Sequence, residues 1–267
     1  MFKRIAILAA LPILATVGHA PTARQTETAA THARPRYHGL NRLVSQREDG
    51  TSTSGNWSGY AVTGSGFTRA IGSWIVPAAK CTSGNQYASF WVGIDGYNSG
   101  TVEQTGTESD CSGSQPHYDA WYEFCCKEPE IVISGMTITP GDVMSAAVVY
   151  NGTNFTLTIL DTTTGQSFRK TGNISGASRT SAEWIAEAPS SGGILPLANF
   201  GTVVFGKDST GVAKTNVAVN PTTTGPIGAF PTFFQITMVD GANNPKAVPS
   251  VLSPDLSSFS DMWVASN

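Results

Sequence analysis

The sequence predicts an all-β protein, built as an antiparallel sandwich of two packed sheets. Segment after segment alternates apolar and polar residues or is rich in β-branched and aromatic residues, which is typical of strands. Clusters of Gly, Ser, Asn and Pro, such as Ser190–Gly193, separate these segments. Windows with helical spacing are few, and the best of them, 179–187, also fits a strand. About 210 residues are available for this domain, which suits a single sandwich with short loops.

The expected strands follow one another along the chain. They cover residues 56–62, 70–76, 88–94, 118–124, 130–138, 143–150, 155–160, 202–205, 233–239 and 262–265. Only 13% of the residues are charged. A low charge content suits a protein that works in acid, where ion pairs fail as carboxylates gain protons.

The first twenty residues predict a secretory signal peptide. Lys3 and Arg4 precede an apolar run over 5–17, and Gly18-His19-Ala20 supplies the small residues of a cleavage site. A membrane anchor is the alternative, but the run is shorter than the roughly 20 apolar residues that a spanning helix needs. We therefore expect a secreted protein from which residues 1–20 are removed, with no membrane association afterwards.

Residues 21–53 differ in composition from the rest of the chain. They hold few large apolar residues, and Arg24, Arg34, Arg36, Arg42 and Arg47 oppose only Glu27, Glu48 and Asp49. The whole chain carries a net charge of −3, so this basic leader precedes an acidic domain over 54–267. We expect a propeptide that lies over an acidic cleft and leaves when low pH protonates the cleft. A flexible tail without a role is the alternative. The acidic domain argues against nucleic acid as a partner.

The four cysteines predict disulfides, because their number is even and an exported chain meets an oxidising environment. Adjacent Cys125 and Cys126 would point to opposite faces of a strand, which favours pairing each of them with Cys81 or Cys111. A zinc site competes with this interpretation, but the chain lacks a Cys-x-x-Cys pair. We expect no metal and no other cofactor.

Several catalytic chemistries find no support in the sequence. His117 is the only histidine of the domain, and a Ser-His-Asp or Cys-His mechanism would have to use it. Neither Gly-x-Ser-x-Gly nor His-Glu-x-x-His occurs, and phosphate-loop and dinucleotide motifs are also missing from the sequence. Carboxylates, amides and aromatic residues remain.

Strand alternation places acidic and aromatic residues on shared faces. Asp119, Trp121 and Glu123 fall on one face of the strand at 118–124, and Trp91 and Asp95 share a face of the preceding segment. Carboxylates spaced among tryptophans on a sheet face indicate a binding groove.

A glutamine and a glutamate are the best candidates for chemistry. Gln104-Thr105-Gly106 stands where a carboxylate-dependent peptidase would show Asp-Thr-Gly, and that acidic motif does not occur in the chain. Glu187 closes the segment Ala182–Glu187. A carboxylate can activate water while an amide N–H stabilises the oxyanion that forms. We therefore predict a Gln/Glu pair.

Together these segments resemble the glutamic peptidases, or eqolisins. The matching pieces are Asn56–Tyr60, Trp91–Gly96, Gln104–Gly106, Tyr118–Glu123, Pro140–Asp142 and Ala182–Glu187. They span most of the domain, whereas the tail from Lys207 onward matches only loosely. This chain departs from the fungal pattern at 124–129, where Cys125 and Cys126 change a loop beside the cleft.

The resemblance implies a lectin-like sandwich of two antiparallel seven-stranded sheets with the active site on its concave face. It assigns the glutamine role to Gln104 and the catalytic glutamate role to Glu187 rather than Glu183. It also implies a monomeric acid endopeptidase, insensitive to pepstatin, that acts on polypeptides. The residues expected to line the site or touch substrate are Trp57, Trp91, Asp95, Asp119, Trp121 and Glu123.

Two other functions fit a lectin-like sandwich. A glycoside hydrolase could use Glu123 and Glu187 as its carboxylate pair, and a carbohydrate-binding module could stack sugars on Trp91 and Trp121. Neither function requires the Gln-Thr-Gly segment or the basic leader, which favours the peptidase.

Overall fold

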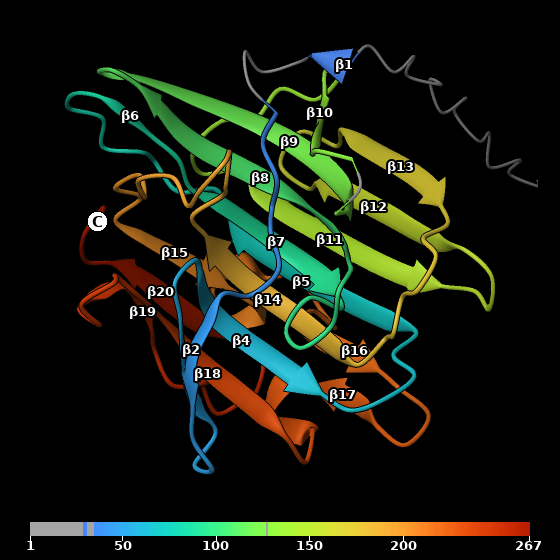
Figure 1. Ribbon diagram of the computed structural model, residues 1–267. Helices are drawn as coiled ribbons and strands as arrows, with labels where there is room; N and C mark the ends of the chain where they lie inside the picture. The colour runs from blue at the N-terminus through green and yellow to red at the C-terminus, as the bar shows by residue number, and fades with distance from the viewer. Residues whose placement is uncertain (1–28, 31–34, 127) are drawn as a thin grey trace, which may run out of the picture.

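The computed structural model describes residues 29–30, 35–126 and 128–267, so the predicted signal peptide lies outside the described part. Strands dominate, and they form two antiparallel layers packed face to face (Figure 1). The helical elements are α1 (Lys207–Thr210) and the 3-10 turn η1 (Ile227–Ala229). Among the described residues no helix has the length and apolar character needed to cross a membrane. The predicted antiparallel sandwich is confirmed.

The first sheet carries the site described below. Its seven main strands run in the order β10 (Ile131–Ile133), β9 (Gln115–Cys125), β8 (Val102–Ser112), β7 (Ser89–Ile94), β14 (Ser181–Glu187), β4 (Trp57–Thr63) and β18 (Phe233–Val239). Short strands extend it: β1 (Ala29–Ala30) on β10, β6 (Asn85–Gln86) on β8, β3 (Thr51–Ser54) parallel to β18, and β2 (Leu43–Gln46) on β3.

The second sheet forms the back of the sandwich. Its order is β13 (Ser167–Gly172), β12 (Phe155–Asp161), β11 (Val143–Tyr150), β5 (Arg69–Ile75), β15 (Thr202–Phe205), β20 (Phe259–Trp263) and β19 (Pro245–Pro249). The hairpin of β16 (Val217–Val219) and β17 (Thr224–Pro226) pairs with β5. Because β19 also pairs with β18, the two sheets join along one edge.

The main core lies between the sheets and follows the period of two. Phe155, Leu157 and Ile159 of β12 point inward, while the residues between them are partly exposed. Phe90 and Trp184 of the first sheet are fully buried in the same cluster. Burying a large apolar side chain contributes about 1.5–3 kcal/mol, so this layer supplies much of the stability.

The outer face of the first sheet is also covered. Every residue of β14 is buried, and so is nearly all of β8. The cover is the leader, whose residues 35–42 cross β9, β8, β7 and β14 as the blue segment in Figure 1. Leu40 of this segment packs on a second apolar cluster that includes Trp57, Trp91 and Trp121.

The disulfide pairing that we expected is wrong. The bonds join Cys81 to Cys111, with Cα atoms 5.4 Å apart, and Cys125 to Cys126. Cys111 and Cys125 lie near opposite ends of the β8–β9 hairpin, since Cys125 pairs with Val102. At ~3.4 Å per residue these ends are about 30 Å apart, which no disulfide spans. Strand alternation does not apply to Cys126, because β9 ends at Cys125, and it gave no information on this separation.

Several carboxylates are buried within the fold. Burial raises the pKa of Glu103 to about 9 and that of Asp261, which accepts a hydrogen bond from Ser58 Oγ at 2.9 Å, to about 8. Burial also raises the pKa of Glu183 well above its ordinary value. The folded chain therefore binds more protons than the unfolded chain from about pH 4 to pH 8. It follows that the free energy of unfolding falls as the pH rises through this interval.

The Asp261→Asn variant tests this linkage. It removes one group that takes up a proton on folding, so the fall of stability with pH should become shallower by up to about 1.4 kcal/mol per pH unit. We expect a more stable protein than wild type at pH 8 and little difference at pH 4, measured by denaturant unfolding. The exposed Asp208→Asn variant controls for the loss of one negative charge. Equal slopes for wild type and Asp261→Asn would contradict the assignment.

Candidate active site

Strand register brings the predicted Gln/Glu pair onto one face of the first sheet. Gln104 on β8 lies between Gly93 of β7 and Glu123 of β9. Glu187 ends β14, opposite Ser89 of β7 and Trp57 of β4. Since alternate residues of a strand share a face, Glu123, Gln104 and Glu187 all point to the side that the leader covers.

A glycine makes room for the aromatic floor of the site. Gly106 pairs with Trp91 on one side and with Trp121 on the other. A Cβ atom there would lie 2.6 Å from Trp91 Cβ and 3.0 Å from Trp121 Cζ2. The glycine of the Gln-Thr-Gly segment is therefore needed for both indoles to reach the site.

The Glu187 carboxylate is fully buried and accepts three hydrogen bonds. Trp91 Nε1 donates to Oε2 at 2.8 Å, Asn56 Nδ2 to Oε1 at 3.3 Å, and the Gly39 amide to Oε1 at 2.9 Å. Burial raises the pKa of Glu187, while His38 and these donors oppose the rise. The donors hold the carboxylate in one orientation.

Gln104 and Glu187 meet across a single peptide group of the leader. Gln104 Nε2 donates to the His38 carbonyl oxygen at 2.7 Å and to Glu123 Oε2 at 2.9 Å. The amide on the other side of the same peptide bond, Gly39 N–H, is the one that donates to Glu187. The carboxamide and the carboxylate are thus spaced to hold one peptide unit between them.

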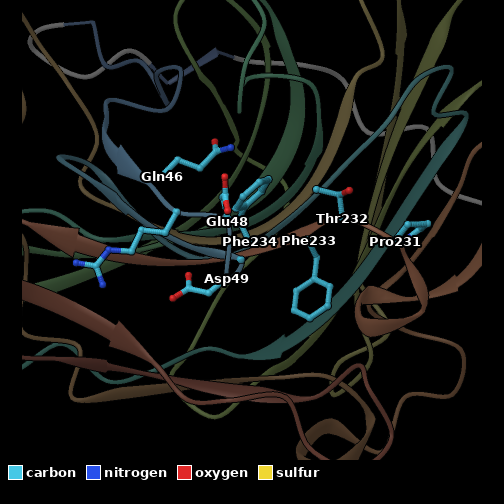
Figure 2. Close-up of a pocket in the computed structure, with 9 residues that line it drawn as sticks. Gln46, Glu48, Asp49, Pro231, Thr232, Phe233 and Phe234 are labelled. Carbon is cyan, nitrogen blue, oxygen red and sulfur yellow. The ribbon is translucent and has the colours of Figure 1, made fainter.

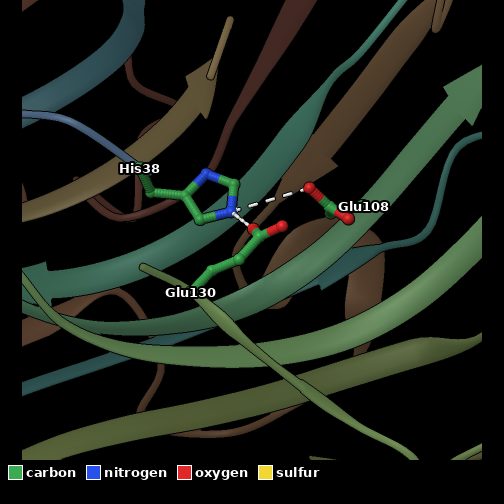
Figure 3. A group of neighbouring side chains, drawn as sticks. All are labelled: His38, Glu108 and Glu130. Atoms are coloured by element: carbon green, nitrogen blue, oxygen red, sulfur yellow. Dashed lines mark hydrogen bonds and ion pairs between the residues drawn. The ribbon is translucent and has the colours of Figure 1, made fainter. Parts of the chain in front are cut away.

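The His38 side chain fills a pocket beside the pair. Its ring stacks on Trp121, with centroids 3.6 Å apart and planes 18° apart. Its Nε2 contacts Glu130 Oε2 and lies 3.6 Å from Glu108 Oε1, as Figure 3 shows. Its Nδ1 lies 3.6 Å from Glu187 Oε2. Burial disfavours a charged ring, but attraction to Glu130 and Glu187 raises the pKa of His38 well above its usual value.

Arg36 extends the charge pairing towards one end of the cleft. Its Nη1 lies 2.8 Å from Glu108 Oε1 and also contacts Asp110 Oδ2, while Nε lies 3.4 Å from Glu130 Oε1. Burial raises the pKa of Asp110 to about 6 and that of Glu108 well above its usual value, and Arg36 opposes both shifts. Cations of the leader therefore compensate buried carboxylates of the domain.

Two other predicted residues, Trp57 and Asp119, lie at different parts of the cleft. Trp57 Nε1 donates to the Gly39 carbonyl at 3.0 Å, and its ring meets Trp91 edge-on at 4.9 Å. Asp119 lies opposite Glu108 and lines a cavity of about 250 Å³ beside Arg36.

Asp95 is the predicted residue whose contacts lie elsewhere. Its carboxylate accepts hydrogen bonds from the amides of Arg179 and Thr180 and from Ser99 Oγ. Residues 179 and 180 lie just before the first residue of β14, roughly 25 Å along the chain from Glu187 at ~3.4 Å per residue. Here Asp95 fixes a loop.

Sequence reasoning missed several residues of the site: Arg36, His38, Asn56, Glu108, Asp110 and Glu130. Two signals pointed to some of them. Glu108 and Asp110 continue the alternation of Gln104 and Gly106 along one strand face, and Arg36 and His38 alternate in the same way within the leader. A basic segment that alternates in this way is suited to lie along an acidic strand.

Three of these side chains also have the spacing of metal ligands. One ligand atom each from His38, Glu108 and Glu130 lie within 4.8 Å of one another (Figure 3). Arg36 forms ion pairs with both glutamates, so cationic side chains of the leader already supply positive charge there. The expectation of no metal stays a prediction.

A separate cavity of about 520 Å³ lies at the turn between β2 and β3. It is lined by 46–50 of that turn and by 231–234 at the start of β18, and Figure 2 shows Glu48 and Phe233 among these residues. None of the residues that line it contacts Gln104 or Glu187 in the described hydrogen bonds. The site described here is therefore the cleft under the leader.

Fold and site define a class: a β-sandwich with a glutamine and a glutamate facing one peptide group on a tryptophan-lined sheet. The peptidase A4 family matches residues 55–239. The match covers more than half of the chain, and the chain belongs to this family.

Individual relatives agree with the assignment. Aspergillopepsin-2 of Aspergillus niger is 35% identical over 179 residues, which are 57% of this chain and 62% of that protein, so less than two thirds of its length is covered. Scytalido-glutamic peptidase with a transition-state analogue is similar with a TM-score of 0.65 and 26% identity over 79% of this chain and 98% of that one. Aspergilloglutamic peptidase from Aspergillus niger gives 0.55 and 30%, over 67% and 99%. SCP-B, an eqolisin in a complex with the tripeptide Ala-Ile-His, gives 0.61 and 26%, over 79% and 98%.

The Trp91→Phe variant should shift the titration of Glu187. A hydrogen bond to a charged group is worth about 1.5–3 kcal/mol, so losing the indole N–H raises the pKa of the Glu187 carboxyl. If Glu187 acts as a base, we expect the acid limb of the kcat/KM profile for peptide hydrolysis to move to higher pH. Trp121→Phe is the control, because its Nε1 has no hydrogen-bond partner among the described residues. Trp121→Phe should change KM and leave the pH of the acid limb unchanged. An unchanged acid limb in Trp91→Phe would argue against the hydrogen bond from Trp91 to Glu187.

Proposed function

We propose that this protein is a secreted, monomeric acid endopeptidase in which Gln104 and Glu187 hydrolyse peptide bonds. One observation carries the proposal: a peptide group lies between the two side chains, with its carbonyl on the carboxamide and its amide on the carboxylate. A hydrolase of peptide bonds needs a donor on the carbonyl oxygen and an acid–base group at the nitrogen. Family membership points the same way.

The mechanism follows from these two contacts. Ionised Glu187 takes a proton from a water molecule as that water attacks the carbonyl carbon. Gln104 Nε2 donates to the oxyanion of the tetrahedral intermediate, an interaction typically worth about 3–4 kcal/mol. Protonated Glu187 then transfers the proton to the leaving nitrogen, and the C–N bond breaks.

Glu123 orients the carboxamide. Its Oε2 accepts from Gln104 Nε2 and from the His38 amide at 3.0 Å, which fixes the donor towards the carbonyl. Burial raises the pKa of Glu123 well above its usual value, so acid conditions keep this group neutral. A neutral Glu123 beside an ionised Glu187 avoids the repulsion of two buried carboxylates. This requirement accounts for action at acid pH.

Substrates are expected to be extended polypeptides. SCP-B is described with the bound tripeptide Ala-Ile-His, and the leader of this chain is an extended segment that stacks His38 on Trp121. A carbohydrate would leave the Gln104 donor and the Glu187 acceptor without the peptide group that fits between them. The glycoside hydrolase and carbohydrate-binding functions are therefore kept only as alternatives that the experiment below distinguishes from the peptidase.

Two substitutions test the pair. Glu187→Gln should lower kcat by up to about 10⁴-fold, because it removes the base, and Gln104→Ala by about 10²- to 10³-fold, because it removes the oxyanion donor. Globin hydrolysis at pH 3–4 with pepstatin present measures the activity, and circular dichroism checks the fold. Release of reducing sugar from glucan is measured in parallel. Near-normal proteolysis by Glu187→Gln, or sugar release without proteolysis, would falsify the proposal.

The same geometry supports the leader as an inhibitor of its own domain. With residues 36–39 in place, the carboxylate and the carboxamide are buried and both of their functional atoms are occupied. Arg36 and His38 lower the pKa values of the carboxylates that they face, namely Asp110, Glu108, Glu123 and Glu187, against the rise caused by burial. The leader therefore binds the ionised cleft best.

The sign of the pH dependence follows from these shifts. The pKa of His38 is raised on docking, so its contribution is complete below about 6.5, the ordinary value. Further acidification removes only the contribution of the carboxylates, among them Asp110, whose pKa is about 6. Docking should thus be strongest near neutral pH and weaken as the pH falls below about 6.

Arg36→Ala should loosen the leader at neutral pH. Removing one partner of a buried charge pair costs about 3 kcal/mol or more, so access to the cleft should rise about a hundredfold at pH 7. The measurement is the affinity of a labelled Ala-Ile-His peptide for Glu187→Gln precursors, which cannot cut themselves, at pH 7 and pH 5. Arg47→Ala is the control, because Arg47 is exposed on the β2–β3 turn. Equal affinities for the Arg36 and Arg47 variants at pH 7 would count against an inhibitory leader.

A further inference from the structure

We propose that the leader is docked as a substrate and that the enzyme hydrolyses its own His38–Gly39 peptide bond, so that the mature chain begins at Gly39. The inference rests on the proposed function and deepens it by naming one bond. The sequence offers no mark of this bond, since composition changes only near residue 53.

Four consecutive backbone groups fix the register of the leader over the pair. The His38 amide donates to Glu123, and the His38 carbonyl accepts from Gln104. The Gly39 amide donates to Glu187, and the Gly39 carbonyl accepts from Trp57 Nε1. Among the described hydrogen bonds, the peptide unit between His38 and Gly39 alone contacts both Gln104 and Glu187.

Contacts on the N-terminal side of the bond hold this register. His38 stacks on Trp121, and Arg36 pairs with Glu108 and Asp110. Tyr37 exchanges two backbone hydrogen bonds of 3.0 Å with Ser190. Shifting the leader by one residue would turn both cations to the opposite face of the extended chain.

Contacts on the C-terminal side hold the chain that would remain. Asn56 accepts from the Arg42 amide at 2.8 Å and donates to the Leu40 carbonyl at 3.1 Å, and the Asn41 amide donates to Gly96 O at 3.1 Å. Beyond these lie β2 and β3, which pair with the sheet. The bond therefore lies between a segment whose cations pair with buried carboxylates and a segment that leads into the paired strands β2 and β3.

The chemical step is an ordinary hydrolysis. Water adds to the carbonyl carbon of His38, and Glu187 takes one of its protons while Gln104 stabilises the oxyanion. The C–N bond then breaks, and Glu187 passes the proton to the Gly39 nitrogen. The products are a His38 carboxylate, on a peptide that carries Arg36, and an amino terminus at Gly39. No co-reactant besides water is needed.

The test follows the full-length wild-type precursor after a shift from pH 7 to pH 5. Intact mass and N-terminal sequencing should report a new terminus at Gly39, formed with a first-order rate that tenfold dilution leaves unchanged. Glu187→Gln should stay uncut. A first mature terminus at any other residue, or a rate that falls in proportion to dilution, would overturn the inference.

A matched pair of variants isolates the bond. Gly39→Pro removes the N–H that donates to Glu187 and should slow the cut between 38 and 39 by at least a hundredfold. Gly39→Ala keeps the N–H, and an added Cβ meets only Ser190 Oγ at 3.5 Å, an ordinary contact. It should be cut at the same bond. Gly39→Pro cut there as fast as Gly39→Ala would also overturn the inference, and thermal unfolding confirms that both precursors fold.

Failure of the inference and failure of the proposed function give different results. If the precursor matures at another bond and then digests globin, the proposed function holds and self-cleavage at His38–Gly39 is wrong. If the protein digests no globin at any acid pH, even after an added protease has removed the leader, the proposed function itself is wrong.

Discussion

The structure depends on one backbone peptide group held between a carboxamide and a carboxylate. Gln104 and Glu187 stand on β8 and β14, with β7 between them, and both reach the unit that links His38 to Gly39. Two side chains on non-adjacent strands can share one peptide unit only if the intervening strand leaves space above it. Gly93 of β7 lies level with Gln104 and carries no side chain, so the Trp91 ring can lie low over the strand; a Cβ atom there would come within 2.9 Å of Trp91 Cζ3.

That arrangement buries carboxylates away from water, and the fold reduces the free-energy cost of burying their charge in two ways. Glu103 and Asp261, away from the pair, are neutral over the acid range because burial raises their pKa values to about 9 and about 8. Glu108 and Asp110, near the pair, are faced instead by cations of the leader. Protonation of these two carboxylates removes the buried negative charge that the cations compensate.

Sequence reasoning succeeded where local periodicity carries the information. Alternation put Asp119, Trp121 and Glu123 on one face, and the register of β9 against β8 confirms it. β8 itself was not among the expected strands, because Val102–Ser112 is polar on both faces. The leader covers one face, and the other packs against the second sheet, where Thr107 Oγ1 accepts from Trp74 Nε1. The partners of Arg36 lie 72 and 74 residues away, and no local pattern specifies such contacts.

The composition of the leader does not predict which of its residues join the sheet. Composition marks residues 21–53 as one basic segment, yet the described part divides into the short strand β1, a stretch across the cleft, 35–42, and the strands β2 and β3. β3 is stabilised by backbone pairing with β18 and needs few apolar side chains, so it resembles the rest of the leader in composition. Composition reports how much apolar surface a segment can bury, whereas membership of a sheet is decided by hydrogen bonds that every residue except proline can make. A segment that crosses the cleft and a segment that pairs with the sheet can therefore share one composition.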